Sequence, residues 1–332
     1  ISWLDQRRAT SVKPVGGLMG LAFKLAKVEK TIRHLQSESE VNWIIENQPE
    51  IWEKTEKYLF LSGYHIYRLT GQFHDSSGSQ VGYVPFNYKH HRWSSSKSLE
   101  ALISPVEQNR LPELYQPGEK LGEITEEASR ETGIPQGLSV IAASTDKACE
   151  ILGSGCLDQR IAALSYGTTA TINTIGKNYI EVTPRMPPYP APIPNAYSTE
   201  IMIYRGYWMV SWFKKQFALR EQQIADLNGV DPESLFDELV NAVPPGAMGL
   251  TLQPYWSPGV SMPEAKGAII GFGDVHTRAH IYRAILEGLA YGLREGKERI
   301  EKRSRVRVEQ LTVAGGGSKS DAAMQLTADI FG

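Results

Sequence analysis

The stretch "LTVAGGGSKSDAAMQLTADIFG", residues 311–332, runs from a strand-like apolar segment through three glycines into a helical pattern. A glycine-rich turn between a strand and a helix commonly binds phosphate, or lets a ligand approach the backbone because no Cβ stands in the way. Lys319 and Ser320 resemble the end of a P-loop. Three interpretations therefore arise: a phosphate loop, another nucleotide contact, or only a tight turn.

The P-loop interpretation fails on spacing. A P-loop has four residues between its first glycine and the sequence Gly-Lys-Ser/Thr. Here Ser318 separates Gly317 from Lys319, and neither a P-loop nor a Gly-x-Gly-x-x-Gly pattern after a strand occurs elsewhere in the chain. The tight turn and the close approach of a ligand both remain open from the residues alone.

The composition indicates a globular protein of two domains. The 332 residues are 41% hydrophobic and 22% charged, and the formal net charge is −2. This charge gives no general reason to expect nucleic acid or an acidic membrane as a partner. Apolar runs stay below the ~18 residues that a transmembrane helix needs. We therefore expect neither nucleic acid nor a membrane as partner.

Two cysteines bear on the cellular compartment. Cys149 and Cys156 stand seven residues apart without neighbouring His or Cys, which favours reduced thiols in a cytoplasmic protein over a disulfide or a metal site. The tandem His90-His91 lacks a third ligand at a suitable spacing, so we interpret it as part of a solvated loop and expect no metal site in the protein itself.

Strand-like and helix-like segments interleave along the whole chain, which predicts α/β architecture in both halves. Residues 137–155 form a buried strand, a polar break and a helix that glycines end, so we place a domain boundary near Gly155, between domains 1–155 and 156–332. Residues 160–176 predict a hairpin around Gly-Thr-Thr. Thr277 is a natural N-cap for the longest helix, and small residues on one of its faces predict close packing.

Three further places carry groups suited to ligand chemistry. Gly167 and Thr168, at the predicted hairpin tip, offer N–H and hydroxyl donors to a phosphate oxygen, or serve only as a turn. Asp146 follows a buried strand, where it would accept a proton from a substrate hydroxyl or only cap a helix. Trp3 would stack on a sugar or lie in the core, and Asp5 would accept bonds from hydroxyl groups.

The order and spacing of these motifs resemble the FGGY family of carbohydrate kinases. The motifs are "WLDQRRA", "STDKACEILGSG", "LSYGTTATI", "EAKGAIIGF" with "RAILEGLAYGLRE", and "VAGGGSKSDAAMQLTADIFG". The resemblance implies two actin-like (ribonuclease H-like) α/β domains with ATP in the cleft between them. It implies transfer of the ATP γ-phosphate to a hydroxyl of a small sugar or polyol with Mg²⁺, in a cytoplasmic dimer or tetramer.

The same resemblance assigns roles to residues. Asp146 matches the catalytic base, and Trp3, Asp5 and Lys147 fall in substrate-binding segments. The nucleotide-binding positions that it implies are Gly167 and Thr168 at a phosphate turn, Gly267 near the phosphates, and Gly316 and Ser320 in the adenosine segment. On this basis Gly315 to Gly317 form a backbone floor for adenine and ribose, with Ser320 at its rim.

The chain also departs from the family pattern. The first phosphate loop and the substrate residues that precede "WLDQRRA" are missing, as is the end of the second domain, so we expect an internal fragment. Lys147 replaces the amide usual in the glycerol and xylulose kinase branches. The segment "DSSGSQVGYVPFNYKHHRW" (75–93) differs from the usual Ser-rich segment, and we assign it no role.

The substrate is therefore open. We favour a ketopentose such as xylulose, with glycerol or another polyol as an alternative. A sugar- or nucleotide-binding homologue without turnover is an alternative of another class, as is an actin-like or heat-shock-like ATPase that lacks a sugar pocket. The retained Asp146 argues against the non-catalytic homologue.

Overall fold

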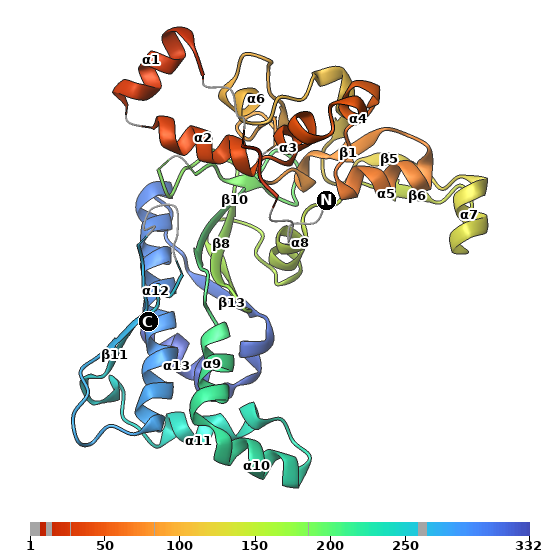
Figure 1. The fold of residues 1–332 in the computed structure, drawn as a ribbon. Helices are drawn as coiled ribbons and strands as arrows, with labels where there is room; N and C mark the ends of the chain where they lie inside the picture. Colours follow the sequence, from red (N-terminus) through yellow and green to blue (C-terminus); the bar gives the residue numbers. More distant parts are fainter. Residues whose placement is uncertain (1–6, 11–14, 27, 83, 185, 258–263) are drawn as a thin grey trace. The chain divides into compact units, whose positions relative to one another are not determined.

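A computed structural model describes residues 7–10, 15–26, 28–82, 84–184, 186–257 and 264–332 (Figure 1). The chain forms two compact units. One comprises Ile1–Cys149 and Tyr189–Tyr197, and the other comprises Glu150–Pro188 and Ser198–Gly332. Each unit mixes helices and strands, as the interleaved sequence pattern predicts.

The first unit is built from short elements. Its helices are α1 (Gly17–Leu25), α2 (Glu29–Glu38), α3 (Glu40–Asn47), α4 (Pro49–Lys54), α5 (Leu61–Thr70), α6 (Leu99–Ile103) and α7 (Glu126–Thr132), and α8 (Asp146–Gly153) begins in it. Its strands are β1 (His74–Ser76), β2 (Phe86–Asn87), β3 (Arg92–Trp93), β4 (Glu113–Tyr115), β5 (Lys120–Glu123), β6 (Ser139–Ile141) and β9 (Tyr189–Pro190).

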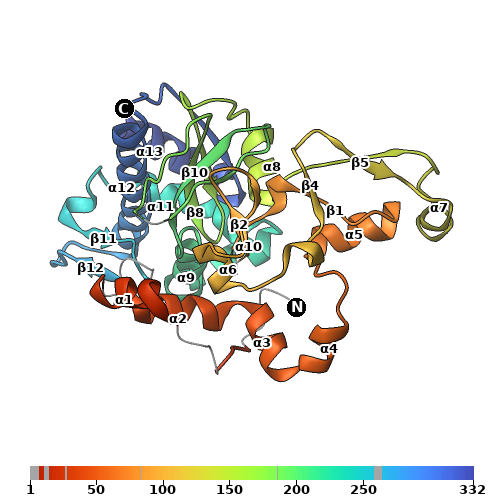
Figure 2. The same cartoon turned by 90° about the horizontal axis from the view of Figure 1, so that it is seen from above.

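These strands pair locally. β1 runs parallel to β4, with Asp75 opposite Leu114, while β2 pairs with β3 and β5 with β6 in antiparallel fashion. β5 and β6 form a ribbon with α7 at its far end (Figures 1 and 2). One small core gathers Ile66 of α5, Leu121 of β5 and Ala142 just after β6. β4 also packs against this core and pairs with β1, so β1 and the segment after β6 belong to the same part of the unit.

The second unit contains the larger sheet. Its helices are α9 (Trp208–Phe217), α10 (Leu219–Asn228), α11 (Phe236–Asn241), α12 (Arg278–Ser304) and α13 (Asp321–Phe331). Its strands are β7 (Ile161–Tyr166), β8 (Ala170–Gly176), β10 (Tyr197–Ile203), β11 (Thr251–Gln253), β12 (Ala268–Ile270) and β13 (Gln310–Ala314).

Two ligand-type turns leave this sheet at the same edge. Four strands lie in the order β13-β7-β8-β10. β7 and β8 are antiparallel, which confirms the hairpin predicted over 160–176. β13 runs parallel to β7, with Ala314 opposite Ser165. Because the carboxyl ends of parallel neighbours meet at one edge, the turn at 315–317 begins beside the hairpin tip at Gly167.

The long helix α12 packs closely on the sheet, as its small residues predict. Thr277 precedes it, and Nδ1 of His280 accepts the Thr277 N–H at 3.1 Å, which confirms the predicted start. A Cβ at Gly296 would lie 2.8 Å from Cγ2 of Ile172 in β8. The surrounding core includes Leu164, Phe213 and Leu289, all fully buried.

Candidate active site

Asp146 is the first residue of α8, but it is not the residue that caps the helix. Oγ1 of Thr145 accepts the N–H of Ala148 at 3.3 Å, and the Thr145 carbonyl accepts the N–H of Cys149 at 2.9 Å. These contacts place Thr145 at the N-cap. The carboxylate of Asp146 is exposed, and its Oδ1 accepts the N–H of Lys147 at 2.7 Å. The capping interpretation of Asp146 is therefore wrong, and its carboxylate faces solvent.

A second segment, to which the sequence assigned no role, lies against the segment that precedes Asp146. Oγ of Ser76 donates to the Ala143 carbonyl at 2.5 Å. The Gly78 carbonyl accepts from Oγ of Ser144 at 2.8 Å and from the N–H of Thr145 at 3.3 Å. The signal for this contact in the sequence is weak: an acidic residue at a strand end, followed by serine and glycine, which any polar turn also contains.

Of the other predicted substrate residues, only Lys147 lies among the residues that the structure describes. Lys147 follows Asp146 in α8 and is half-buried. Trp3 and Asp5 lie outside the described residues. Cys149, one turn beyond Asp146, is an exposed free thiol whose Sγ lies 3.6 Å from the Ser144 carbonyl, whereas Cys156 is buried.

The hairpin tip in the second unit is anchored by its carbonyl groups. The Gly167 carbonyl accepts the N–H of Tyr207 at 3.0 Å, and the Thr168 carbonyl accepts the N–H of Trp208 at 3.3 Å. Both donors lie at the start of α9. The Thr168 side chain remains exposed. The tip is thus held in place by the first residues of α9, while Thr168 is exposed.

The three glycines of the opening stretch have different roles. Gly315 has a φ of 95°, and a Cβ there would lie 2.8 Å from the Tyr166 carbonyl group. A Cβ at Gly317 would overlap the ring of Tyr207. At Gly316, by contrast, no described atom lies within 4 Å of an added Cβ. Two glycines are therefore required by packing, and the middle one faces open space.

Two stacked tyrosines form the support of this turn. The rings of Tyr166 and Tyr207 lie 4.5 Å apart and nearly parallel. The Tyr166 hydroxyl shares a hydrogen bond of 2.7 Å with Oγ1 of Thr327 in α13. Burial raises the pKa of Tyr166 to about 12, although the Thr327 hydrogen bond lowers it, and burial also raises the pKa of Tyr207. These rings act as packing groups beneath the turn.

Ser320 and Gly267 have structural contacts of their own. Oγ of Ser320 accepts the N–H of Ala323 at 3.1 Å, as the N-cap of α13, and donates to Oδ1 of Asp237 at 2.5 Å. A Cβ at Gly267 would overlap the ring of Trp256. Their contacts with a nucleotide stay predictions.

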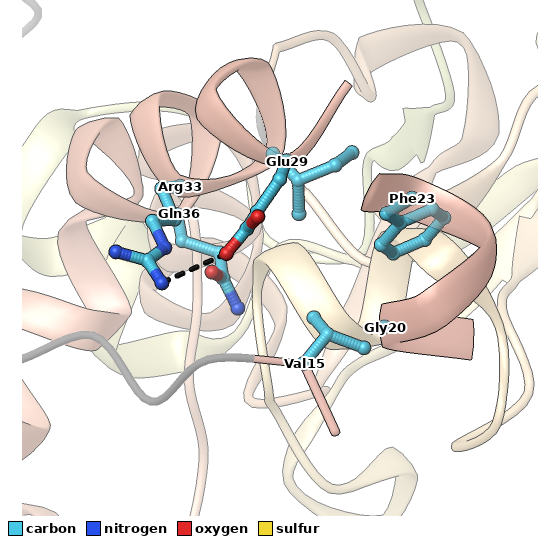
Figure 3. A pocket seen from close by; sticks show the side chains of 7 residues that line it. Val15, Gly20, Phe23, Glu29, Arg33 and Gln36 are labelled. Atoms are coloured by element: carbon cyan, nitrogen blue, oxygen red, sulfur yellow. Dashed lines mark hydrogen bonds and ion pairs between the residues drawn. The ribbon is translucent and has the colours of Figure 1, made fainter. Parts of the chain in front are cut away.

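One cavity of the first unit is far too small for a sugar. It has a volume of about 10 Å³ and lies between α1 and α2 in the first unit, lined in part by Phe23, Gln36 and the ion pair of Arg33 with Glu29 (Figure 3). A space of this size holds about one water molecule.

Metal ligands do not gather in the described part of the chain. Within it, no three His, Cys, Asp or Glu side chains form a group that could hold a metal ion. His91 is buried rather than solvated, which corrects the sequence interpretation, and its ring lies 4.8 Å from that of Tyr197. Burial lowers the pKa of His91, and neighbouring His90 lowers it further.

Two family models match the chain in succession. The N-terminal domain model of the FGGY family of carbohydrate kinases matches residues 1–153, and the C-terminal domain model matches residues 162–332. The chain belongs to the FGGY family of carbohydrate kinases. The family predicted from the motifs is thereby confirmed, while the boundary near Gly155 stays a proposal.

Curated relatives are sugar kinases. The uncharacterized sugar kinase YgcE of Escherichia coli (strain K12) is 33% identical over 276 residues, which cover 81% of this chain and 55% of that protein. A xylulose kinase of Lactococcus lactis is 25% identical over 338 residues, which cover 100% of this chain and 64% of that protein. The chain thus spans 55% and 64% of the length of these two relatives.

A solved structure has the same fold. The xylulose kinase from Rhodospirillum rubrum superposes with a TM-score of 0.76 at 22% identity, covering 92% of this chain and 58% of that one. The two-domain, actin-like α/β fold predicted from the resemblance is confirmed. Among the helices of the described ranges, none has the length and apolar character required to cross a membrane.

Proposed function

We propose that the protein phosphorylates a hydroxyl of a small sugar or polyol with ATP, and that a ketopentose such as xylulose is the favoured substrate. The observation that carries this proposal is the exposed carboxylate of Asp146, at the start of a helix that Thr145 caps. Membership of a carbohydrate kinase family and similarity to xylulose kinases support it.

Asp146 acts as the general base. Its carboxylate accepts the proton of the attacking hydroxyl, and the resulting oxygen forms a bond to the γ-phosphorus while the bond to the β,γ-bridging oxygen breaks and ADP leaves. The N-terminus of α8 favours a negative charge at this place. Phosphoryl transfer depends mainly on positioning and charge neutralisation, so one oriented carboxylate suffices.

The second unit supplies the nucleotide groups. The space beside Gly316 fits the approach of adenine and ribose, and the anchored tip at Gly167 and Thr168 suits the phosphates. Gly267 and Ser320 complete the proposed nucleotide site. Mg²⁺ bound with ATP would neutralise charge on the phosphates.

The remaining predictions also stay proposals. Trp3, Asp5 and Lys147 would contact the sugar. The domains 1–155 and 156–332, the cytoplasmic location and the assembly into a dimer or tetramer are proposed from the sequence and the family resemblance.

The test uses the full-length protein and a coupled assay of ADP release with ketopentoses, ketohexoses, glycerol and tetritols. A substrate that raises ADP release above the rate with ATP alone is expected. Asp146→Asn should lower kcat by several orders of magnitude, roughly the range of a lost base and its positioning, with nucleotide affinity nearly unchanged. Glu127→Gln, which removes an exposed carboxylate from α7, is the matched control.

Two results would contradict the proposal. If no compound in the panel raises ADP release while sugar and nucleotide both bind, the protein is a binding homologue without turnover. Unchanged kcat in Asp146→Asn removes this residue from its role as base.

A further inference from the structure

We infer that the 76–78 turn, formed by Ser76, Ser77 and Gly78, positions the catalytic base by holding the segment 143–145 that precedes Asp146. This inference rests on the proposed function, because it concerns the geometry of the same carboxylate. The residues of the turn act through segment 143–145 and are positioning residues.

Three hydrogen bonds join the turn to the segment. They run from Ser76 Oγ to the Ala143 carbonyl, from Ser144 Oγ to the Gly78 carbonyl, and from the Thr145 N–H to the Gly78 carbonyl. Segment 143–145 connects β6 to α8, and its last residue caps the helix on which Asp146 stands. A displacement of this segment therefore moves the carboxylate.

The close approach also depends on the missing side chain of Gly78. An added Cβ would lie 2.5 Å from Ser144 Oγ, 2.9 Å from Cγ of Pro117 and 3.0 Å from the Ala143 carbonyl oxygen. Two of these three atoms belong to segment 143–145. Contacts this short force the neighbour to shift, so any larger residue at 78 would displace the segment that precedes the base.

The turn is itself rigid. Asp75 is fully buried, and its Oδ1 accepts the Ser76 N–H at 2.7 Å. Nε2 of Gln80 donates to the Ser76 carbonyl at 2.9 Å, and the Gly78 N–H donates to Ser76 Oγ at 3.1 Å. β1 also pairs with β4. The turn is therefore held by contacts that do not involve segment 143–145.

Ser62 offers a matched control in the same network. Its Oγ donates to Oδ2 of Asp75 at 2.9 Å, from α5, and this contact does not involve segment 143–145. Ser62→Ala and Ser76→Ala each delete one hydroxyl near the same buried carboxylate. Only Ser76→Ala removes a contact with the segment, and it also removes the acceptor of the Gly78 N–H within the turn.

Steady-state kinetics and a thiol probe in the full-length protein test the inference. Ser76→Ala should lower kcat roughly 10- to 100-fold, because a displacement of about 1 Å in a catalytic group has effects of this size, while the KM for ATP changes less than about twofold. Ser62→Ala should keep kcat near the parent value although it also lowers the melting temperature. The Cys149 thiol contacts the Ser144 carbonyl of the segment. Its alkylation, followed by mass spectrometry of its peptide, should therefore be faster in Ser76→Ala than in the parent protein, and unchanged in Ser62→Ala.

Equal effects of Ser62→Ala and Ser76→Ala on kcat would overturn the inference, since both would then act through stability alone. A lower kcat in Ser76→Ala without faster alkylation of Cys149 would also overturn it. Full activity of Asp146→Asn, measured alongside, is the separate result that marks failure of the proposed function.

Discussion

At the scale of single residues, the three adjacent glycines 315–317 differ in what an added side chain would meet. Gly315 adopts a φ of 95° against Tyr166, a Cβ at Gly317 would overlap the Tyr207 ring, and Gly316 borders open space. Only the middle glycine is therefore available to a ligand without a cost to packing.

This difference predicts opposite outcomes for the same substitution. Gly316→Val should fold with nearly unchanged melting temperature and raise the KM for ATP far more than the KM for sugar, because its side chain occupies the space proposed for adenosine. Gly317→Val should lower the melting temperature sharply, because its side chain overlaps the Tyr207 ring. Thermal unfolding and steady-state kinetics of both variants check this. An unchanged KM for ATP in Gly316→Val would place the nucleotide elsewhere.

Some features of single residues have a local signal in the sequence, and others do not. The position of Asp146 after a strand is a local signal, but its role as base was predicted only from the family resemblance and stays a proposal. The contact between Ser76 and Ala143 joins residues 67 positions apart, and serines and glycines in a polar stretch give no local sign of such a partner.

At the scale of elements, two glycines of helix α12, Gly288 and Gly292, differ in the atoms that an added side chain would meet. A Cβ at Gly288 would lie 2.8 Å from the Leu252 carbonyl oxygen, whereas at Gly292 the nearest atom, also at 2.8 Å, is Cδ1 of Ile203. A backbone oxygen can move only if the chain moves, whereas Cδ1 of an isoleucine can move by rotation of its side chain.

Alanine substitutions should separate the two positions. Each gains about 1 kcal/mol of helix propensity. Gly288→Ala should still destabilise the protein, by up to about 2 kcal/mol, since overpacking costs about 1–3 kcal/mol and exceeds the gain in propensity. Gly292→Ala should stay within about 0.5 kcal/mol of the parent or gain stability, because the overlap is relieved by a side-chain rotation. Urea denaturation measures both, and equal losses would contradict the packing described for α12.

A buried ion pair connects α10 to the start of α12. Glu221 is buried and bonds Arg278. Burial by itself raises the pKa of Glu221, but its hydrogen bonds and the charge of Arg278 outweigh burial and leave this pKa below the ordinary value of 4.5. The pair therefore stabilises the fold above the pKa of the unfolded chain, and this contribution is lost as the pH falls through the folded-state pKa.

Glu221→Gln should consequently lower the free energy of unfolding by roughly 1–3 kcal/mol at pH 7, with the difference shrinking below about pH 4.5. Glu298→Gln, which removes an exposed partner of Arg294 on the same helix, should cost less than about 0.5 kcal/mol. Urea denaturation at several pH values distinguishes the two. If Glu221→Gln lowers the free energy of unfolding by the same amount at pH 4 and pH 7, the ion pair does not cause the loss of stability.

At the scale of the whole molecule, the chain does not pass once from one unit to the next. Residues Tyr189–Tyr197 return to the first unit, where the Tyr197 hydroxyl donates to the Lys89 carbonyl at 2.7 Å. The proposed domains 1–155 and 156–332 do not include a return of the chain to the first domain. Proline-rich residues such as 187–194 carry no periodic pattern that would reveal which unit they join.

The sequence by itself determined the α/β class, the family, the hairpin over 160–176 and the start of the long helix at Thr277, because each depends on periodicity, turn chemistry or motif spacing within a short stretch. Tertiary structure alone decided that Thr145 rather than Asp146 caps α8, that Gly316 is open while its two neighbours are packed, and that the 76–78 turn holds the segment before Asp146. These outcomes depend on which distant atoms occupy the space around a residue, and local sequence does not contain that information.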